Sequence, residues 1–118
     1  MSIRVYLIDD EPKALSILQN KLERFCPQLT IIGKSQKPEE AITFIKSEKP
    51  ELIFLDIAMP TMTGFELLRE FDEPSFEIIF VTAFDHYAVD AIKHCAIGYI
   101  VKPVAKEDLI LSVYRAIE

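Results

Sequence analysis

Four short hydrophobic runs, each followed by a polar residue, constrain the fold of this chain more than any other feature. The runs are IRVYLI, LIFL, IIFV and YIV, and the polar residues that follow them are Asp9 with Asp10, Asp56, Thr82 and Lys102. Runs that are apolar nearly throughout are typical of strands covered on both faces, as in a parallel sheet. If the runs are parallel strands, these polar side chains emerge at one edge of the sheet and share one small pocket.

The segments between the runs predict helices. Short β-rich runs alternate with stretches of helical period, which indicates five strand–helix units around a parallel sheet. We expect strands over residues 3–8, 29–33, 52–56, 78–82 and 98–101. We expect helices over residues 12–25 and 65–71, and further helices that begin near residues 38, 85 and 106, the last continuing to the chain end.

Apolar stripes predict which faces of these helices are buried. The positions expected to face the core are Leu15, Leu18, Leu22 and Phe25, then Ala41, Ile42 and Ile45, then Ala88, Ala91, Ile92 and Cys95, and finally Leu109, Val113, Ala116 and Ile117. Ile110 and Tyr114 lie one turn apart in the last helix, off this stripe. They are either an exposed dimer contact, or scattered surface residues, or part of a wider buried face.

Right-handed crossovers place helices on both faces of such a sheet. The expected fold class is therefore α/β, a flavodoxin-like doubly wound parallel sheet of five strands with five flanking helices. We assume the strand order 2-1-3-4-5, which puts the crevice at the carboxyl ends of strands 1 and 3. Asp9, Asp10 and Asp56 would then flank this crevice, with Thr82 and Lys102 on the next two strands.

Composition narrows the classes of function. The chain has 118 residues, half of them hydrophobic, which fits one domain with one sizeable core. No apolar stretch reaches the roughly 18 residues of a membrane span, and the start MSIRVYLIDDE turns acidic too early for a secretory signal, so we expect a cytoplasmic protein. A net charge of -6 disfavours direct nucleic-acid binding. Cys26 and Cys95 are expected to be buried, reduced thiols.

Three carboxylates close together need a counter-charge to stay ionised. Mg²⁺ can supply it, because this ion prefers oxygen ligands and is typically held by one or two carboxylates together with phosphate oxygens and waters. Asp10 and Asp56 are the best candidates for direct ligands, with Asp9 bound directly or through water. The backbone carbonyl of Ala58 is a further candidate, because the chain turns away from its strand there.

In this arrangement Asp56 can act as a carboxylate nucleophile on phosphorus and form an aspartyl phosphate. Lys102 would neutralise phosphoryl oxygens, and Thr82 would donate a hydrogen bond to one of them. Each residue alone has a plainer interpretation, as a helix cap for the triplet 9–11, a turn residue, a common strand residue or a surface lysine. Their conjunction at the ends of different predicted strands favours the phosphoryl site.

These residues resemble the receiver domain of two-component response regulators, and the resemblance covers the whole chain. The matching segments are LIDDEP, LIFLDIAMPTMTGFELL, IIFVTAF and GYIVKP. The resemblance implies that Asp9 and Asp10 are the acidic metal-binding pair. It implies that Asp56 is the phosphoacceptor and that Lys102 is the phosphate-binding lysine. It also implies a sensor histidine kinase as the phosphate donor.

The resemblance further implies a conformational switch. Thr82 looks like the hydroxyl that moves toward the phosphoryl group, and the small Ala83 leaves access to it. Tyr99 looks like the aromatic residue whose rotamer changes, and Pro103 looks like the family's cis proline. The surface of the fourth helix, fifth strand and fifth helix would then change, and this surface is a possible homodimer contact.

The run VTAFDHYAVDAIKHCAIGYIVKPV is similar to receivers of the LytR/AlgR class, which usually precede a LytTR-type DNA-binding domain. We therefore expect residues 1–118 to be a single receiver domain without its output domain, with DNA contacted only through that missing domain. A stand-alone receiver is the alternative. The histidine kinase is expected to dock on the loop after the fifth strand and on the first helix, where Ala14, Ile17 and Lys21 lie beside the site.

Three positions depart from the family's commoner residues. Ala58 is small and Phe84 is bulky and aromatic, and both border the line of attack on the phosphoryl group. We expect this pair to affect the lifetime of the phospho-aspartate, in a direction that the sequence does not give. Gly98 stands before Tyr99 where Asp is common, which weakens the expected local support for the aromatic switch.

Three other classes of protein fit the sequence less well. A phosphatase of the haloacid dehalogenase type would need a DxD pattern where this chain reads DDEP, as well as room for a cap domain. A flavodoxin-like cofactor binder would need a phosphate loop rich in Gly, Ser and Thr there. A phosphorylation-independent interaction module has no need of all five polar groups. We therefore expect no enzyme with an external substrate, but a signalling domain that phosphorylates and dephosphorylates itself.

Overall fold

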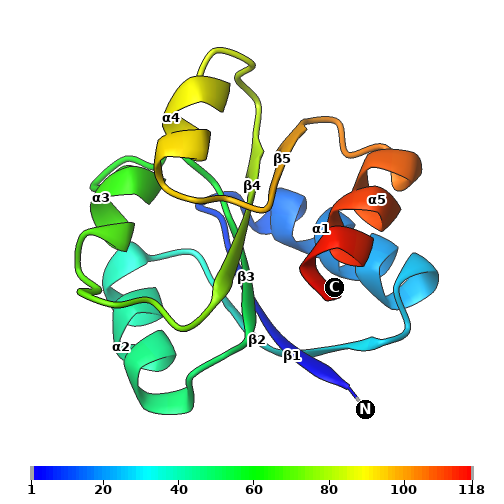
Figure 1. The fold of residues 1–118 in the computed structure, drawn as a ribbon, viewed down its shortest axis with the longest axis horizontal. Coiled ribbons are helices and arrows are strands. Elements are labelled where there is room, and N and C mark those ends of the chain that lie inside the picture. Colours follow the sequence, from blue (N-terminus) through cyan, green and yellow to red (C-terminus); the bar gives the residue numbers. More distant parts are fainter. Residues whose placement is uncertain (1, 118) are drawn as a thin grey trace.

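The computed structural model describes residues 2–117 as a five-stranded parallel sheet with helices on both faces (Figure 1). The strands are β1 (Ile3–Ile8), β2 (Leu29–Ser35), β3 (Leu52–Leu55), β4 (Glu77–Thr82) and β5 (Gly98–Val101). They lie in the order β2-β1-β3-β4-β5, and each neighbouring pair is parallel. The fold class and the strand order expected from the sequence are confirmed.

The helices are α1 (Pro12–Phe25), α2 (Pro38–Glu48), α3 (Gly64–Leu68), α4 (Ala88–Lys93) and α5 (Lys106–Ile117). Figure 1 shows α1 and α5 on one face of the sheet and α2, α3 and α4 on the other. The strand order reverses between β1 and β3. The loop after β1 therefore leads to α1 on one face of the sheet, and the loop after β3 leads to α3 on the other, which leaves a crevice at the carboxyl edge. None of the helices within residues 2–117 combines the length and the apolar character needed to cross a bilayer.

Each face of the sheet has its own hydrophobic core, because successive side chains of a strand point to opposite sides. In β1, Val5 and Leu7 pack toward α1 and α5, while Tyr6 and Ile8 pack toward the other helices. The buried helical residues on the first side are Leu15, Leu18, Leu22, Leu109 and Val113. Those on the second side are Ala41, Ile45, Leu67, Leu68 and Ala91. This two-sided burial explains the nearly unbroken apolar runs of the sequence.

Some predicted boundaries are wrong by a few residues. β2 continues to Ser35, two residues further than predicted, because Ser35 still pairs with Ile8 at the end of β1. β3 ends one residue earlier than predicted, so Asp56 lies directly after it. α3 ends at Leu68 rather than at residue 71, because the next amide hydrogen bonds tighten to the i→i+3 spacing of a turn.

The sequence prediction was least accurate for α4. This helix begins at Ala88 rather than near residue 85 and has six residues, of which only Ala91 is buried. Ala88, Ile92 and Cys95 were expected to face the core, but all three are exposed, Ile92 at 73%. A helix of fewer than two turns presents little more than one side chain to the sheet. Cys95 follows it with a positive φ of 59° and an exposed thiol.

On α5 the predicted stripe is correct except at its end. Leu109 and Val113 are buried, but Ile117 is 43% exposed. Ser112 is buried instead, against Gly98 of β5. A Cβ atom at Gly98 would lie 2.8 Å from the Ser112 Oγ, so the missing side chain allows α5 to pack closely on the sheet.

Ile110 and Tyr114 are 43% and 62% exposed, respectively, so they do not belong to a wider buried face. Their exposure is compatible with a dimer contact, which stays a prediction. The expectation for the cysteines is half right, because Cys26 is buried and Cys95 is not.

Candidate functional site

The carboxyl edge of the sheet collects the polar residues that end the hydrophobic runs. Asp9 and Asp10 follow β1, Asp56 follows β3, Thr82 is the last residue of β4, and Lys102 follows β5. One carboxylate oxygen from each of the three aspartates lies within 4.8 Å of the others. The sheet topology therefore brings together groups that are up to 93 residues apart in the sequence.

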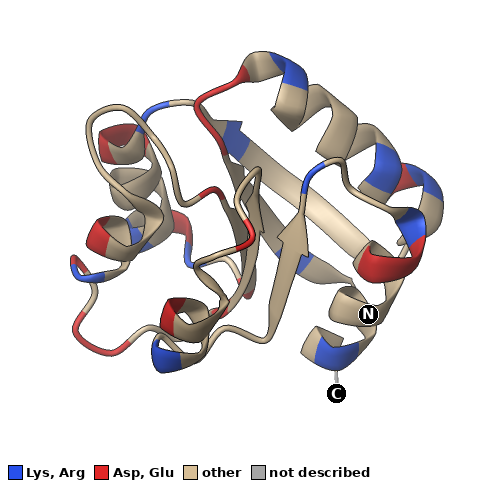
Figure 2. Ribbon diagram, turned by 90° about the horizontal axis from the view of Figure 1, so that it is seen from above, with Lys and Arg blue, Asp and Glu red and all other residues tan. Residues whose placement is uncertain are grey.

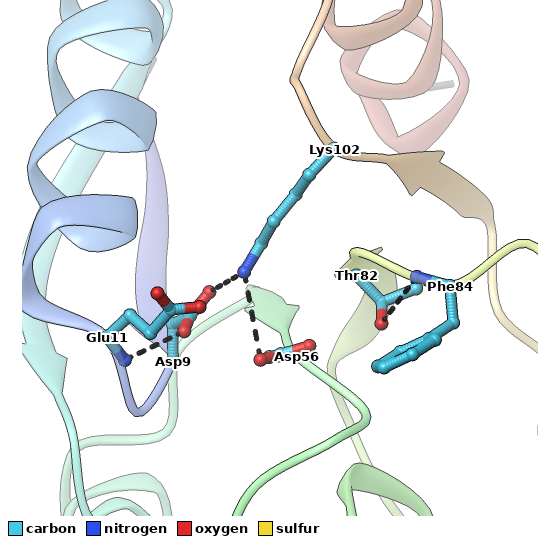
Figure 3. A network of polar contacts seen from close by, with 6 residues as sticks. All are labelled: Asp9, Glu11, Asp56, Thr82, Phe84 and Lys102. Carbon is cyan, nitrogen blue, oxygen red and sulfur yellow. Dashed lines mark hydrogen bonds and ion pairs between the residues drawn. The ribbon is translucent and has the colours of Figure 1, made fainter.

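Lys102 crosses this edge and contacts two of the carboxylates (Figure 3). Its Nζ donates a hydrogen bond to the Asp9 Oδ2 at 2.7 Å and lies 3.8 Å from the Asp56 Oδ2. Asp9 and Asp56 are each only 4% exposed, whereas Asp10 is half-buried. One ammonium group therefore faces three carboxylates in a partly desolvated site.

The electrostatics of the cluster are unbalanced. Burial, then the charge of Asp9, raises the pKa of Asp56 to about 7, against the lowering effect of Lys102. Burial alone would lower the pKa of Lys102, but its hydrogen bond to Asp9 and the surrounding carboxylates raise that pKa. A further cation would lower the free energy of the ionised cluster.

The donor set fits Mg²⁺, since it consists of hard oxygen ligands and carries an excess of negative charge. Asp9, Asp10 and Asp56 offer one oxygen each. Ala58 lies two residues after Asp56 with its side chain exposed, and the role of its carbonyl stays a prediction. The three carboxylates are thus the residues that could hold the ion.

The helix-cap interpretation of the acidic triplet is not supported. The residue before α1 is Glu11, and its side chain makes no capping hydrogen bond. The Asp9 Oδ1 accepts a hydrogen bond from the Glu11 amide at 3.0 Å, which fixes the carboxylate while its other oxygen binds Lys102. Asp9 is therefore oriented toward the site rather than toward the helix end.

Thr82 and Tyr99 are connected through the backbone of the loop between β4 and α4. The buried Thr82 Oγ1 accepts a hydrogen bond from the Phe84 amide at 3.4 Å. The Tyr99 hydroxyl donates to the Phe84 carbonyl at 2.6 Å and accepts from the Tyr87 amide at 3.3 Å. These bonds hold residues 84–87 in a loop, which explains why α4 begins later than predicted.

The remaining switch residues lie near the same edge. The bond between Lys102 and Pro103 is cis, as the resemblance implies. Ala83 is exposed next to Thr82. Figure 3 shows Asp56 between Asp9 and Thr82, with the ring of Phe84 below Thr82.

Gly64 is a positioning residue that the sequence reasoning missed. Its amide donates a hydrogen bond to the Ile57 carbonyl at 2.9 Å, and a Cβ atom at this position would lie 2.6 Å from the Asp56 carbonyl oxygen. Thr63 precedes it and forms a capping box with Glu66. The glycine at the end of the loop IAMPTMTG, within the matching segment LIFLDIAMPTMTGFELL, was the available signal of this close approach.

Comparison with protein families gives a match over nearly the whole chain. Residues 5–114 match the family described as the response regulator receiver domain. An uncharacterized response regulatory protein of Vibrio cholerae is 40% identical over 110 residues, which are 92% of this chain and 46% of that protein.

Two relatives with named roles are similar over nearly all of this chain. The positive alginate biosynthesis regulatory protein of Pseudomonas aeruginosa is 36% identical over 117 residues, covering 97% of this chain and 47% of that protein. The transcriptional regulatory protein BtsR of Escherichia coli is 36% identical over 114 residues, covering 96% and 47%. The chain therefore spans about half the length of the curated relatives it matches.

Solved structures show the same fold. The response regulatory domain of protein mrkE from Klebsiella pneumoniae superposes with a TM-score of 0.86 at 27% identity, covering 98% of this chain and 95% of that one. The signal receiver domain of a modulated diguanylate cyclase from Desulfovibrio desulfuricans G20 has a TM-score of 0.83 at 26% identity, covering 99% and 94%.

Proposed function

Because the chain belongs to the response regulator receiver domains, we propose that it is a phospho-accepting switch in which Asp56 receives the phosphoryl group. One observation carries this proposal. The buried Asp56 carboxylate lies within 4.8 Å of oxygens from Asp9 and Asp10, and 3.8 Å from the Lys102 ammonium. A buried carboxylate with a strongly raised pKa in a cleft is typical of a reacting group.

The chemistry follows from these positions. A carboxylate oxygen of Asp56 attacks the phosphorus of a phosphohistidine, and the bond from phosphorus to the imidazole nitrogen breaks. Lys102 exchanges its contact with Asp9 for a phosphoryl oxygen, and the Thr82 hydroxyl donates to another. Mg²⁺ held by the three aspartates would neutralise charge on the phosphoryl oxygens. The product stays on the chain, so no external substrate is turned over.

We place the signal path along the hydrogen bonds of the loop between β4 and α4. When the Thr82 hydroxyl turns toward a phosphoryl group, it gives up the Phe84 amide. The Phe84 carbonyl holds Tyr99, so this change shifts the population of Tyr99 rotamers and the surface of α4, β5 and α5. The exposed Ile110 and Tyr114 on α5 support a homodimer contact on this surface.

We assign the chain to the LytR/AlgR class, as a single receiver domain that controls a separate DNA-binding output domain. The support is its similarity to the alginate and BtsR regulators, which are named for regulation and are about twice as long as the matched region. The net charge of -6 makes residues 1–118 a poor ligand for DNA, so DNA contact would belong to the output domain.

The phosphate donor in this proposal is a sensor histidine kinase that docks on α1 and on the loop after β5. Ala14, Ile17 and Lys21 border the site there. Replacing Ala14 and Ile17 by Glu should slow transfer from a phosphorylated kinase but spare labelling by acetyl phosphate. Val89→Glu, on the exposed side of α4, is the control. Equal loss with both donors would contradict this docking face.

The acceptor is tested by chemical trapping. Borohydride reduces an acyl phosphate, so treatment after labelling with acetyl phosphate should convert Asp56 to homoserine, as read from peptide masses. Conversion of another carboxylate, with Asp56 unchanged, would overturn the assignment.

A further inference from the structure

A small cavity opens between α1 and the segment that follows β5, next to the aspartate cluster. Its volume is about 150 Å³. Ala14, Ile17 and Leu18 line it from α1, and Val104 lines it from the segment after β5. Asp9 and Lys102 form the end nearest the site, and Lys21 lies on the α1 side.

The walls of the cavity are mainly apolar. Leu18 and Val104 are buried, whereas Ile17 is 44% exposed and leaves its side chain available to an incoming group. A cavity of about this volume, lined by aliphatic side chains, is known to hold one benzene ring. The space therefore suits a single apolar ring or a branched aliphatic group of that size.

The charges around the cavity differ between its two ends. Lys102 is already paired with Asp9 at 2.7 Å, and the neighbouring Asp10 and Asp56 give this end an excess of negative charge. No carboxylate among residues 2–117 lies within ion-pair distance of Lys21, which leaves one uncompensated ammonium group. Figure 2 shows Lys and Arg along α1 and at the start of the segment after β5. A ligand with two negative charges would bring the second one toward Asp9.

We propose that this cavity binds a small monocarboxylic acid with one apolar ring, of the size of benzoate, with its carboxylate toward Lys21. The ring replaces water against Ala14, Leu18 and Val104, and the carboxylate pairs with the free ammonium. Binding of this ligand does not depend on the proposed function. A ligand here would also cover part of the face on which we place the histidine kinase, and only this effect on kinase docking rests on the proposed function.

The test is a titration of the ¹⁵N-labelled chain with benzoate at constant ionic strength, followed by amide chemical shifts. Saturable shifts are expected at residues 14–21 and at Val104, with a Kd on the order of 1 mM. Benzyl alcohol, the neutral analogue, should bind several-fold more weakly, and phthalate should bind more weakly than benzoate.

Variants separate the cavity from the general surface. Lys21→Met should weaken benzoate by roughly two- to five-fold and leave benzyl alcohol unchanged. Lys13→Met, an exposed lysine on the same helix, should change neither. Ala14→Phe fills the cavity and should abolish the binding of both benzoate and benzyl alcohol. If this larger residue disturbs the fold, Ala14→Leu should fill the cavity and have the same effect on binding. Absence of saturable shifts, or equal effects of the two lysine variants, would overturn the proposal.

Discussion

The Lys102 Nζ lies 2.7 Å from the Asp9 Oδ2 but 3.8 Å from the Asp56 Oδ2. The lysine therefore makes its hydrogen bond with a neighbour of the proposed acceptor, not with the acceptor itself. Asp56 makes no hydrogen bond with Lys102, while the lysine is held beside both carboxylates.

Replacing Lys102 by Met should destabilise the fold. The variant leaves Asp9 and Asp56 close together without their cation, so the free energy of unfolding at pH 7.5 in EDTA should fall by about 1–3 kcal/mol. The lysine side chain is 19% exposed, so the loss should be smaller than for a fully buried pair. Urea unfolding measures it, with Lys13→Met as the control. A change within about 0.5 kcal/mol, as for an ordinary surface residue, would contradict this account.

Because the pKa of Asp56 is raised, we expect Asp56→Asn to become more stable relative to the unmodified chain as the pH rises. The folded chain holds the Asp56 proton up to a pKa of about 7, whereas the unfolded chain releases it near the ordinary pKa of about 3.9. This contribution to stability is present at low pH and is lost as the pH rises through about 7. The free energy of unfolding of Asp56→Asn, relative to that of the unmodified chain in EDTA, should therefore rise by about 1–3 kcal/mol from pH 5 to pH 8.5.

Urea unfolding at the two pH values provides the measurement. Adding Mg²⁺ at pH 8.5 should reduce the advantage of the variant, because the ion would compensate the ionised cluster only in the unmodified chain. A stability difference that stays constant with pH would show that the pKa of Asp56 is not raised.

The Tyr99 hydroxyl should protect the loop between β4 and α4. Tyr99→Phe removes the acceptor of the Tyr87 amide and the donor to the Phe84 carbonyl. Hydrogen exchange of the Tyr87 amide should become about five-fold faster, which corresponds to about 1 kcal/mol. Tyr114→Phe, at a tyrosine that is 62% exposed, is the matched control. Unchanged exchange in Tyr99→Phe would remove the hydroxyl from the proposed signal path.

Gly64→Ala should harm both stability and phosphorylation. The added Cβ atom would lie 2.6 Å from the Asp56 carbonyl oxygen, so the backbone that carries the acceptor must move. We expect the free energy of unfolding to fall by about 1–3 kcal/mol and labelling by acetyl phosphate to slow about tenfold. Helix propensity alone predicts a gain in stability of up to about 1 kcal/mol, so a stabilised variant would refute the steric argument. Thr63→Ser, which keeps the capping hydroxyl, is the control.

The sequence sufficed for the sheet and for the meeting of polar residues at its carboxyl edge. Long apolar runs specify strands that are covered on both faces, and parallel strands place their carboxyl ends together, so Asp9 and Asp56 could be brought together without a structure. Features that depend on tertiary distances could not be predicted. These include the choice of Asp9 as the partner of Lys102, and the close approach at Gly64.

The fourth helix shows the limit of periodicity most clearly. Ile92 fits an apolar stripe yet is 73% exposed, because α4 has six residues and packs on the sheet through Ala91. The hydrogen bonds that shorten this helix are made by Tyr99, which lies in β5, and no local sequence pattern predicts them.

Phosphorylation of Asp56 is tested most directly by intact-mass spectrometry after incubation with acetyl phosphate, with and without Mg²⁺. We expect a single added phosphoryl group that requires Mg²⁺, is absent in Asp56→Asn and persists in Asp72→Asn, a control at an exposed position. No adduct under conditions that label another receiver domain, or an adduct that survives in Asp56→Asn, would contradict it.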